Sequence, residues 1–343
     1  MDVTLRDGSY AIDFSFTSLD TFYICKALEE AGVEYIEIGH GMGFNATRNG
    51  HKGAIETDET YLESANSALK TAKFGMFSIA GLALLEDFEL GAKYNMGFVR
   101  IGADVEKVHE MEPYIKKAKD CGLEVMANFM KSYVMTPEQM TEKVLLVEQY
   151  GADAAYIVDS AGCMIPDDIA AFYDAIRKRS GIRLGFHGHD NLGMAIANSF
   201  EACRKGYALV DTSLQGLGRS SGNASTEVLN ALLVKTGYDT GLDLMKILEI
   251  GQKYIYPLMD DRGKKSLDII LGYAEFHSSY VDQVWKCAVK NFVNPLYLIL
   301  EMSKIDKVNL DRRMMDEVAK KMRREDINVI QYDFRKYIGG EQG

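Results

Sequence analysis

The sequence of 343 residues predicts a (β/α)8 barrel over residues 1–240 and a C-terminal helical domain over residues 241–343. The first observation is a recurring unit of amphipathic helix, glycine and short apolar strand, as at Gly151 before residues 156–159. The second is the spacing of such glycines, which at positions 97, 122, 151, 181 and 206 are 25, 29, 30 and 25 residues apart. Eight such units in about 235 residues match the size of a (β/α)8 barrel. The third is that beyond Thr240 the strand pattern stops and apolar residues recur at helical spacing.

Eight expected strands follow one another along the barrel. They are short apolar runs at residues 3–6, 35–38, 74–78, 98–101, 125–128, 156–159, 184–187 and 209–211. The carboxyl ends of parallel barrel strands surround one mouth, where catalytic side chains gather. The residues predicted to lie there are Arg6, Asp7, His40, Asn128, Asp159, Ser160, His187, His189, Ser213 and Gln215. An open doubly wound sheet is the alternative, but no GxGxxG motif opens a helix after an early strand.

Segments outside the strands are also assigned from the sequence. The glycine-rich stretch 39–50 follows the second strand and is predicted to be a lid over the mouth, with a plain surface loop as the alternative. Another glycine-rich stretch, 216–223, precedes a helix that begins near Ser225. Helices of the C-terminal domain are expected at residues 242–255, 280–292, 295–302 and 312–324.

The composition bounds the class of function. Hydrophobic residues make up 47% of the chain, enough to fill a large core. The net charge of -11 and the pI of about 5.2 argue against a nucleic-acid-binding surface. The sequence contains no apolar run of about 18 residues, so we expect no membrane span. The opening Met1-Asp2-Val3-Thr4 does not resemble a signal peptide. We therefore expect a cytoplasmic protein that acts on small molecules.

A metal site is predicted from His187, His189 and Asp7. Two histidines one residue apart on a strand point to the same side, so both imidazoles can reach one ion. Asp7 at the end of the first expected strand supplies a third ligand. One carboxylate and two imidazoles, with open positions, suit Mn²⁺, Mg²⁺, Fe²⁺ or Zn²⁺ and leave room for a bidentate substrate. The alternative for Arg6 and Asp7 is a structural ion pair that closes the end of the barrel.

Three ordered motifs carry a resemblance to a known family. They are residues 2–8 (DVTLRDG), residues 187–193 (HGHDNLG) and the pair 216–218 (GLG) and 222–224 (GNA). They resemble the 4-hydroxy-2-oxovalerate aldolases, within the HMG-CoA lyase-like lyases that share an Asp-Arg-Glu-type first strand on a barrel. The resemblance covers nearly the whole chain, including the helical tail.

The resemblance implies a metal-dependent aldolase. Such an enzyme cleaves a 4-hydroxy-2-oxoacid into pyruvate and an aldehyde, or condenses them, through a pyruvate enolate held at the metal. Asp7, His187 and His189 would bind the divalent ion, most often Mn²⁺, with Mg²⁺, Co²⁺ or Zn²⁺ as alternatives. Arg6 would stabilise the enolate, and Ser160 would bind the pyruvate carboxylate. Arg6 would add a fixed cation at the oxygen where charge develops, beside the Lewis acid that the ion supplies.

The sequence departs from the family at its acid–base residues. The aldolases carry a histidine four positions after the motif arginine, where this chain has Tyr10, and a tyrosine in a tail segment, where this chain has His277. We hypothesise that the pair is exchanged, so that His277 is the base or proton shuttle and Tyr10 its hydrogen-bonding neighbour. The alternative is that the base is lost and the protein is a catalytically silent, metal-binding relative.

Other functions and partners remain open at this stage. An acyl-CoA-dependent lyase or synthase on the same scaffold is the rival enzyme, although residues 216–223 contain no cysteine of the kind such lyases use. Asn223 is a further candidate to approach the metal, as a related asparagine does in some members of the superfamily. By resemblance, the C-terminal helices would pair with an acylating aldehyde dehydrogenase or with a second copy of the chain.

Overall fold

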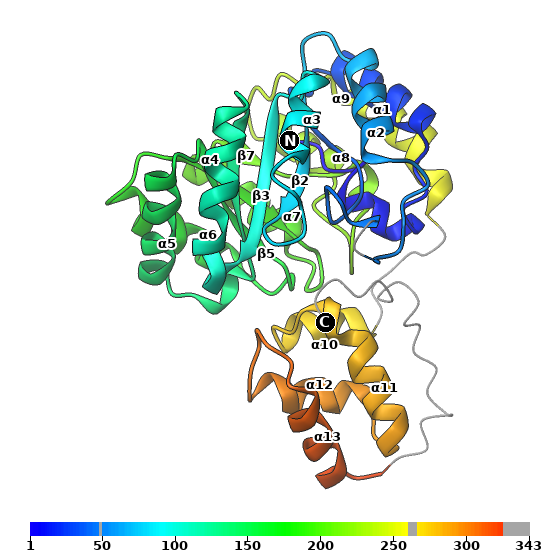
Figure 1. The fold of residues 1–343 in the computed structure, drawn as a ribbon, viewed down its shortest axis with the longest axis vertical. Helices are drawn as coiled ribbons and strands as arrows, with labels where there is room; N and C mark the ends of the chain where they lie inside the picture. The colour runs from blue at the N-terminus through cyan, green and yellow to red at the C-terminus, as the bar shows by residue number, and fades with distance from the viewer. Residues whose placement is uncertain (48–49, 260–265, 325–343) are drawn as a thin grey trace.

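The computed structural model describes residues 1–47, 50–259 and 266–324. Seven parallel strands follow one another in a single sheet in the order of the sequence. Helices lie around the outside of the curled sheet (Figure 1). The strands are β1 (Tyr35–Ile38), β2 (Lys73–Ile79), β3 (Phe98–Asp104), β4 (Glu124–Met130), β5 (Ala154–Asp159), β6 (Arg183–Gly188) and β7 (Leu209–Val210).

The first expected strand, residues 3–6, is wrong. Only Asp2 pairs with both edges of the sheet, through parallel bridges to Ile36 and Thr212. The Asp2 carboxylate accepts the Thr4 N–H at 3.0 Å, and the N–H groups of the next residues turn back to the Val3 carbonyl. The chain therefore curls into a 3-10 helix, η1 (Asp7–Ile12), after one bridging residue. The two edges of the sheet are joined through this short stretch, in which Asp2 bonds to Tyr35 and Glu37 while Met1 and Val3 bond to Thr212.

Helices alternate with the strands as the glycine spacing predicts. Thr17 and Thr136 form capping boxes at the starts of α1 and α5, and Gly151 and Gly206 adopt left-handed conformations at the ends of α5 and α7. The helices are α1 (Ser18–Glu30), α2 (Asp58–Ala68), α3 (Asp87–Lys93), α4 (Glu112–Asp120), α5 (Pro137–Tyr150), α6 (Pro166–Arg177), α7 (Ala195–Lys205) and α8 (Thr226–Lys235).

The glycine-rich stretch after β1 is packed rather than open. Residues 39–46 are buried, and Gly43 pairs with Ser78 of β2. A Cβ atom on Gly43 would lie 1.9 Å from the Phe77 carbonyl oxygen, so only glycine allows this close approach. The ring of His40 stacks on Phe14 at 4.1 Å between centroids. The predicted lid is therefore wrong for residues 39–46, which form part of the wall; residues 48–49 lie outside the described part of the chain.

The helices after the barrel belong to two hydrophobic cores. Helix α9 (Leu244–Ile250) and the π-helical turn Gly251–Ile255 place Ile247, Ile250 and Ile255 in the core of the barrel. A second core is shared by later helices, which are α10 (Ser266–Tyr273), α11 (Val281–Asn291), α12 (Pro295–Ser303) and α13 (Arg312–Lys321). The expected boundary at residue 240 thus differs from the packing, in which the change of core falls after Ile255.

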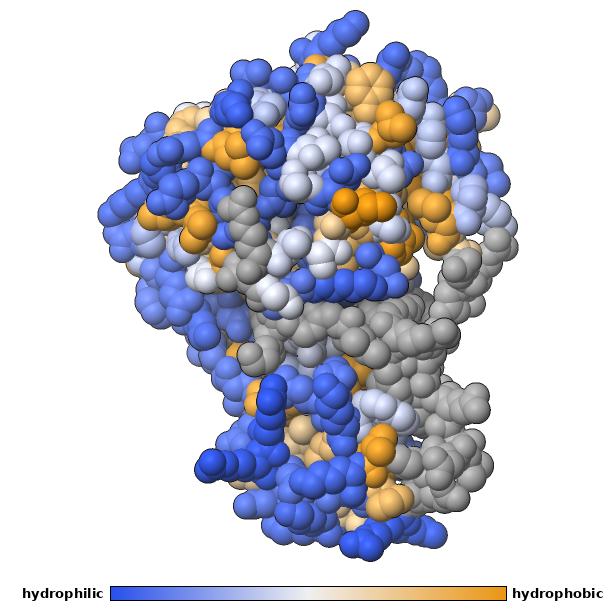
Figure 2. Space-filling view, turned by 45° about the vertical axis from the view of Figure 1, so that its right-hand side comes forward, coloured by the Kyte–Doolittle hydropathy of each residue, from blue (hydrophilic) through white to orange (hydrophobic). Residues whose placement is uncertain are grey.

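The C-terminal helices lie beside the barrel as a separate body (Figure 1). The face of this body seen in Figure 2 is mostly hydrophilic, with scattered apolar residues. Within the described part of the chain, every helix is too short or too polar to cross a bilayer.

Candidate metal centre

Three predicted ligands meet at one end of the barrel. Asp7 begins η1, His187 lies in β6, and His189 follows that strand directly. All three are buried, and one ligand atom from each lies within 4.8 Å of the others. Because the chain turns sharply at Val3, Asp7 points toward the two histidines. The imidazole rings lie 5.1 Å apart and nearly perpendicular, which suits two ligands of one ion.

The donor set around these residues fits a divalent cation. His187 Nδ1 lies 2.9 Å from Asp211 Oδ2, and His189 Nδ1 lies 3.3 Å from the Gly222 carbonyl oxygen. Both oxygens accept the Nδ1 proton, which leaves each Nε2 free to bind metal. Asn223 donates its Nδ2 proton to Asp7 Oδ2 at 2.8 Å, whereas its buried Oδ1 accepts no hydrogen bond within the described residues. This amide oxygen fits the role of a fourth ligand.

The electrostatics of the site keep Asp7 and His189 in their metal-binding protonation states. Burial raises the pKa of Asp7, but Arg6, the two histidines and Asn223 outweigh it and hold that pKa well below its usual range. Burial lowers the pKa of His189 to about 4, although Asp7 opposes this shift. At neutral pH the site therefore offers a carboxylate and an unprotonated imidazole, as metal binding requires.

A chain of buried charges runs from Asp7 through the barrel interior. Arg6 contacts Asp7 at 2.8 Å through its Nη1 atom and Glu37 at 2.7 Å through its Nε atom. Arg100 contacts Glu37 at 3.0 Å and Asp211 at 2.7 Å. Each member is at least nine-tenths buried, so the pairs are held in a medium of low dielectric constant.

This chain of charges returns to the metal ligands, because Asp211 contacts His187. Glu37, Arg100 and Asp211 were not predicted as site residues. Their signal in the sequence is a charged residue inside or directly after an apolar strand, since residues 35–38 read YIEI and residues 98–101 read FVRI. Such a residue must be paired when it faces a barrel interior.

Ser160 follows β5 and is buried near the carboxyl end of β4. Its Oγ atom accepts the backbone N–H of Lys131 at 3.0 Å. Lys131 itself is fully buried and has a positive φ of 63°. Sequence reasoning missed this residue, because a lysine after a strand usually reaches solvent.

The predicted exchange partners, Tyr10 and His277, are both near the mouth but share no hydrogen bond within the described residues. Tyr10 packs edge-on against Phe14 at 5.1 Å, and burial raises its pKa. His277 caps the short 3-10 helix η8 (Ser278–Tyr280), with Nδ1 2.8 Å from Ser279 Oγ. Arg219 contacts both neighbourhoods: its guanidinium carbon lies 5.2 Å from the Tyr10 ring centroid, and its Nε donates to Ser278 Oγ at 2.8 Å.

The remaining residues predicted at the mouth have local partners. Asn128 accepts Arg100 Nη2 at 2.7 Å, and so belongs to the chain of charges. Asp159 accepts the N–H groups of Cys163 and Met164, and burial raises its pKa to about 6. Gln215 donates to Glu227 at 2.9 Å. The backbone N–H of Ser213 donates to the carbonyl of Ala224, and His40 Nδ1 accepts the N–H of Met42. None of these contacts joins the three metal-ligand candidates directly.

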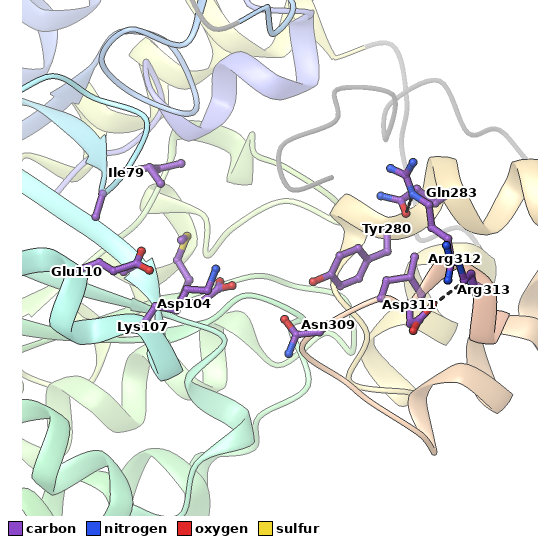
Figure 3. A pocket seen from close by; sticks show the side chains of 14 residues that line it. Ile79, Asp104, Lys107, Glu110, Tyr280, Gln283, Asn309, Asp311, Arg312 and Arg313 are labelled. Carbon is purple, nitrogen blue, oxygen red and sulfur yellow. Dashed lines mark hydrogen bonds between the residues drawn. The ribbon is translucent and has the colours of Figure 1, made fainter.

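A cleft of about 980 Å³ lies between the rim of the barrel and the C-terminal helices. Figure 3 shows Asp104, Lys107 and Glu110 from the barrel side opposite Tyr280 from the helical side. Further polar residues on the helical wall are Gln283, Asn309, Asp311, Arg312 and Arg313. The mouth is thus bounded on one side by the helical body.

Comparison with known proteins agrees with this geometry. A family model described as HMGL-like matches residues 1–253. The 4-hydroxy-2-oxovalerate aldolase of Carboxydothermus hydrogenoformans is 35% identical over 322 residues, which cover 93% of this chain and 95% of that protein. That of Pelotomaculum thermopropionicum is 36% identical over 327 residues, with 94% and 96% covered.

Solved structures share the fold. The carboxyl transferase domain of Rhizobium etli pyruvate carboxylase has a TM-score of 0.77 at 16% identity, covering 93% of this chain and 59% of that one. The HMG-CoA lyase of Brucella melitensis has a TM-score of 0.63 at 19% identity, covering 76% of this chain and 98% of that one. Together with the matched sequences, these observations show that the chain belongs to the HMGL-like family and, within it, to the 4-hydroxy-2-oxovalerate aldolase family.

Proposed function

We propose that this chain is a divalent-metal-dependent aldolase that cleaves a 4-hydroxy-2-oxoacid into pyruvate and an aldehyde, or catalyses the reverse condensation. Relatives that are 35–36% identical are named for that activity, and the match covers nearly their whole length. The observation that carries the proposal is the buried group of Asp7, His187 and His189 beside the guanidinium of Arg6. It combines a cation site with a fixed positive charge at one barrel mouth.

Asp7, His187 and His189 would hold the ion, Mn²⁺ in the first instance, with the Asn223 amide oxygen beside them. When bound, such an ion supplies a Lewis acid for the keto oxygen of a 2-oxoacid. Arg6 supplies a second positive charge, and its contacts with Glu37 and Asp7 fix the guanidinium in place before substrate arrives. A preorganised cation of this kind stabilises the enolate oxygen that forms when the C3–C4 bond breaks.

Ser160 is suited to bind the substrate carboxylate. Its Oγ atom already accepts a hydrogen bond from the Lys131 backbone, so its own hydroxyl proton can be donated to a carboxylate oxygen. The remaining step is removal of the proton from the C4 hydroxyl. We assign it to His277, because burial, followed by the charges of Arg219, Lys131 and His189, holds its pKa well below 6.5 and keeps it neutral. The Ser279 backbone N–H donates to His277 Nδ1 at 3.2 Å, so the resting ring carries its proton on Nε2. Nε2 would accept the substrate proton once this contact is exchanged for an Nδ1–H bond to Ser279 Oγ, which lies 2.8 Å from Nδ1.

We further propose that the C-terminal helices form a functional domain of their own, which brings His277 to the mouth and offers a docking surface. Phe292 after α11 and Tyr297 in α12 expose 55% and 58% of their surface. Exposed aromatic residues of this kind are common in protein interfaces. An acylating aldehyde dehydrogenase or a second copy of the chain would bind there.

The activity is tested with metal-stripped protein supplied with Mn²⁺, pyruvate and a panel of aldehydes, with pyruvate consumption as the signal. The expected result is consumption that requires both Mn²⁺ and one class of aldehyde, and that His189→Gln abolishes. Turnover only with an acyl-CoA would favour the rival synthase. No turnover with any aldehyde, by protein shown to bind Mn²⁺, would favour the silent relative and contradict the aldolase.

A further inference from the structure

Two cationic residues of the barrel contact the segment that carries His277, one on each side of it. Lys131 follows β4, and Arg219 lies in the glycine-rich loop after β7. Their side chains reach Tyr280 and Ser278, the last and first residues of η8. His277 precedes η8 directly, so these two contacts bracket the short segment 277–280.

Lys131 connects the barrel to the helical body. Its Nζ atom lies 3.2 Å from Asp104 Oδ2, 3.1 Å from the Tyr280 hydroxyl and 3.0 Å from the Val308 carbonyl oxygen. Asp104 and Tyr280 face each other across the cleft in Figure 3. A fully buried ammonium with three oxygen partners from two bodies holds those bodies at a fixed separation.

Arg219 makes the corresponding contact on the other side. Its Nε donates to Ser278 Oγ at 2.8 Å, and its guanidinium lies over the Tyr10 ring. The loop can follow this course only with a glycine at position 218. A Cβ atom on Gly218 would lie 2.3 Å from Asn223 Nδ2 and 2.9 Å from Asp7 Oδ2. The loop is thus pressed against the metal-ligand candidates.

Both residues also use their backbone N–H groups on the barrel site. The Lys131 N–H donates to Ser160 Oγ at 3.0 Å, and the Arg219 N–H donates to Asp7 Oδ2 at 3.2 Å. Each residue therefore contacts the proposed site with its backbone and the C-terminal segment with its side chain. A shift of the segment must pull on the same residues that orient Ser160 and Asp7.

We infer that Lys131 and Arg219 are positioning residues that couple the seating of segment 277–280 to the metal and carboxylate sites of the barrel. The inference rests on the proposed function for the roles of Asp7, Ser160 and His277. Thermodynamic coupling is reciprocal, so ion binding at Asp7 stabilises the seated segment, and a seated segment tightens ion binding. His277 is thereby held more firmly in its working position when the barrel site is complete.

The test measures coupling without turnover. Amide hydrogen exchange of the peptide containing residues 277–280 is followed in the full-length protein with and without Mn²⁺, and Mn²⁺ affinity is measured by titration. In the parent protein, Mn²⁺ should slow exchange of this peptide. Arg219→Met should weaken Mn²⁺ binding by about tenfold, at the low end of what loss of outer contacts costs a metal site, and should abolish the effect of Mn²⁺ on exchange. Lys131→Met should speed exchange of the peptide with and without Mn²⁺.

Milder variants guard against misfolding, since Lys131→Met removes the buried cation beside Asp104. Ser278→Ala and Tyr280→Phe each remove one contact from the helical side, and each should reproduce part of the loss. Arg204→Met and Lys286→Met are matched controls, because these cations pair with Glu201 and Asp282 on exposed helix surfaces. They should change neither signal.

Three outcomes would overturn the inference. The first is an exchange rate of residues 277–280 in the parent protein that does not change when Mn²⁺ is added. The second is an unchanged Mn²⁺ affinity in both Arg219→Met and Ser278→Ala. The third is a change in exchange or Mn²⁺ affinity in the control variants as large as that in the test variants. The aldolase assay is read separately on the parent protein. A protein without aldolase activity that still shows the coupling would contradict the proposed function and leave the coupling standing.

Discussion

Replacement of Asp211 by asparagine tests whether the buried chain of charges orients the metal ligands. The Asp211 carboxylate accepts from His187 Nδ1 at 2.9 Å and pairs with Arg100 at 2.7 Å. Burial opposes its charge, but Arg100 and then His187 lower the pKa of Asp211 from 3.8 to about 2. The difference corresponds to a preference of about 2 kcal/mol for the carboxylate over the protonated acid.

The sign of this effect follows from linkage. A carboxyl group whose pKa is lowered by folding contributes stability above pH 3.8, and this contribution is lost as the pH falls through about 2. At pH 7 the Asp211→Asn variant should therefore unfold with a free energy lower than that of the parent by about 2 kcal/mol. It should also bind Mn²⁺ about 10- to 100-fold more weakly, because the His187 ring loses the carboxylate that fixes its tautomer.

The assay is urea unfolding in the presence of chelator, together with Mn²⁺ titration of the folded protein. Asp153→Asn is the matched control, because Asp153 also pairs with a cation and accepts a backbone N–H, but at the amino end of β5. Its Mn²⁺ affinity should match that of the parent. An Asp211→Asn variant with parental Mn²⁺ affinity would refute the reasoning, as would an equal loss of affinity in Asp153→Asn.

Three further predictions follow from the same geometry. Arg6→Lys should lower kcat by about 10²- to 10³-fold with a smaller change in KM. A lysine ammonium cannot contact both Asp7 and Glu37 and still place its charge at the enolate oxygen. An unchanged kcat would show that Arg6 does not stabilise the enolate. His277→Ala should lower kcat by about 10²-fold or more, and Tyr10→Phe should lower it less. The acid limb of the kcat–pH profile should lie below pH 6.5, because base function is lost only as the pH falls through the lowered pKa of His277. A limb at or above pH 6.5, or full activity in His277→Ala, would refute the assignment. Removal of metal by chelation should lower Tm, and Mn²⁺ at about 100 times its Kd should restore about 2.7 kcal/mol of stability, whereas Asp7→Asn should show no such recovery at that concentration.

The βα pattern was readable from the sequence because the strands are largely buried and several helices end at or near a glycine, as at Gly151 and Gly206. The pattern failed where local contacts outweighed it. Residues 3–6 look like a strand, but the Asp2 side chain satisfies the Thr4 N–H and starts a turn. The stretch 39–46 looks like a loop by composition, yet its glycines allow close packing against β2.

The candidate ligands could be predicted because two histidines one residue apart on a strand point to the same side of the strand. The contacts of Arg219 and Lys131 could not, because they depend on how a separate helical body sits on the barrel. No local pattern in the sequence records that arrangement. The missed residues Glu37 and Arg100 were visible as charges in apolar strands, and asking for their partners would have led to Arg6 and Asp211.

The buried chain of charges has a consequence for the order in which ligands arrive. Two guanidinium groups, Arg6 and Arg100, stand against three carboxylates, those of Asp7, Glu37 and Asp211, which leaves one negative charge. An interior of this sign attracts a divalent cation and repels the anion of a 2-oxoacid. Once the cation is in place the sign is reversed, and the same interior attracts the oxoacid. From this group of five charges we expect ordered binding, with the ion first and the oxoacid second.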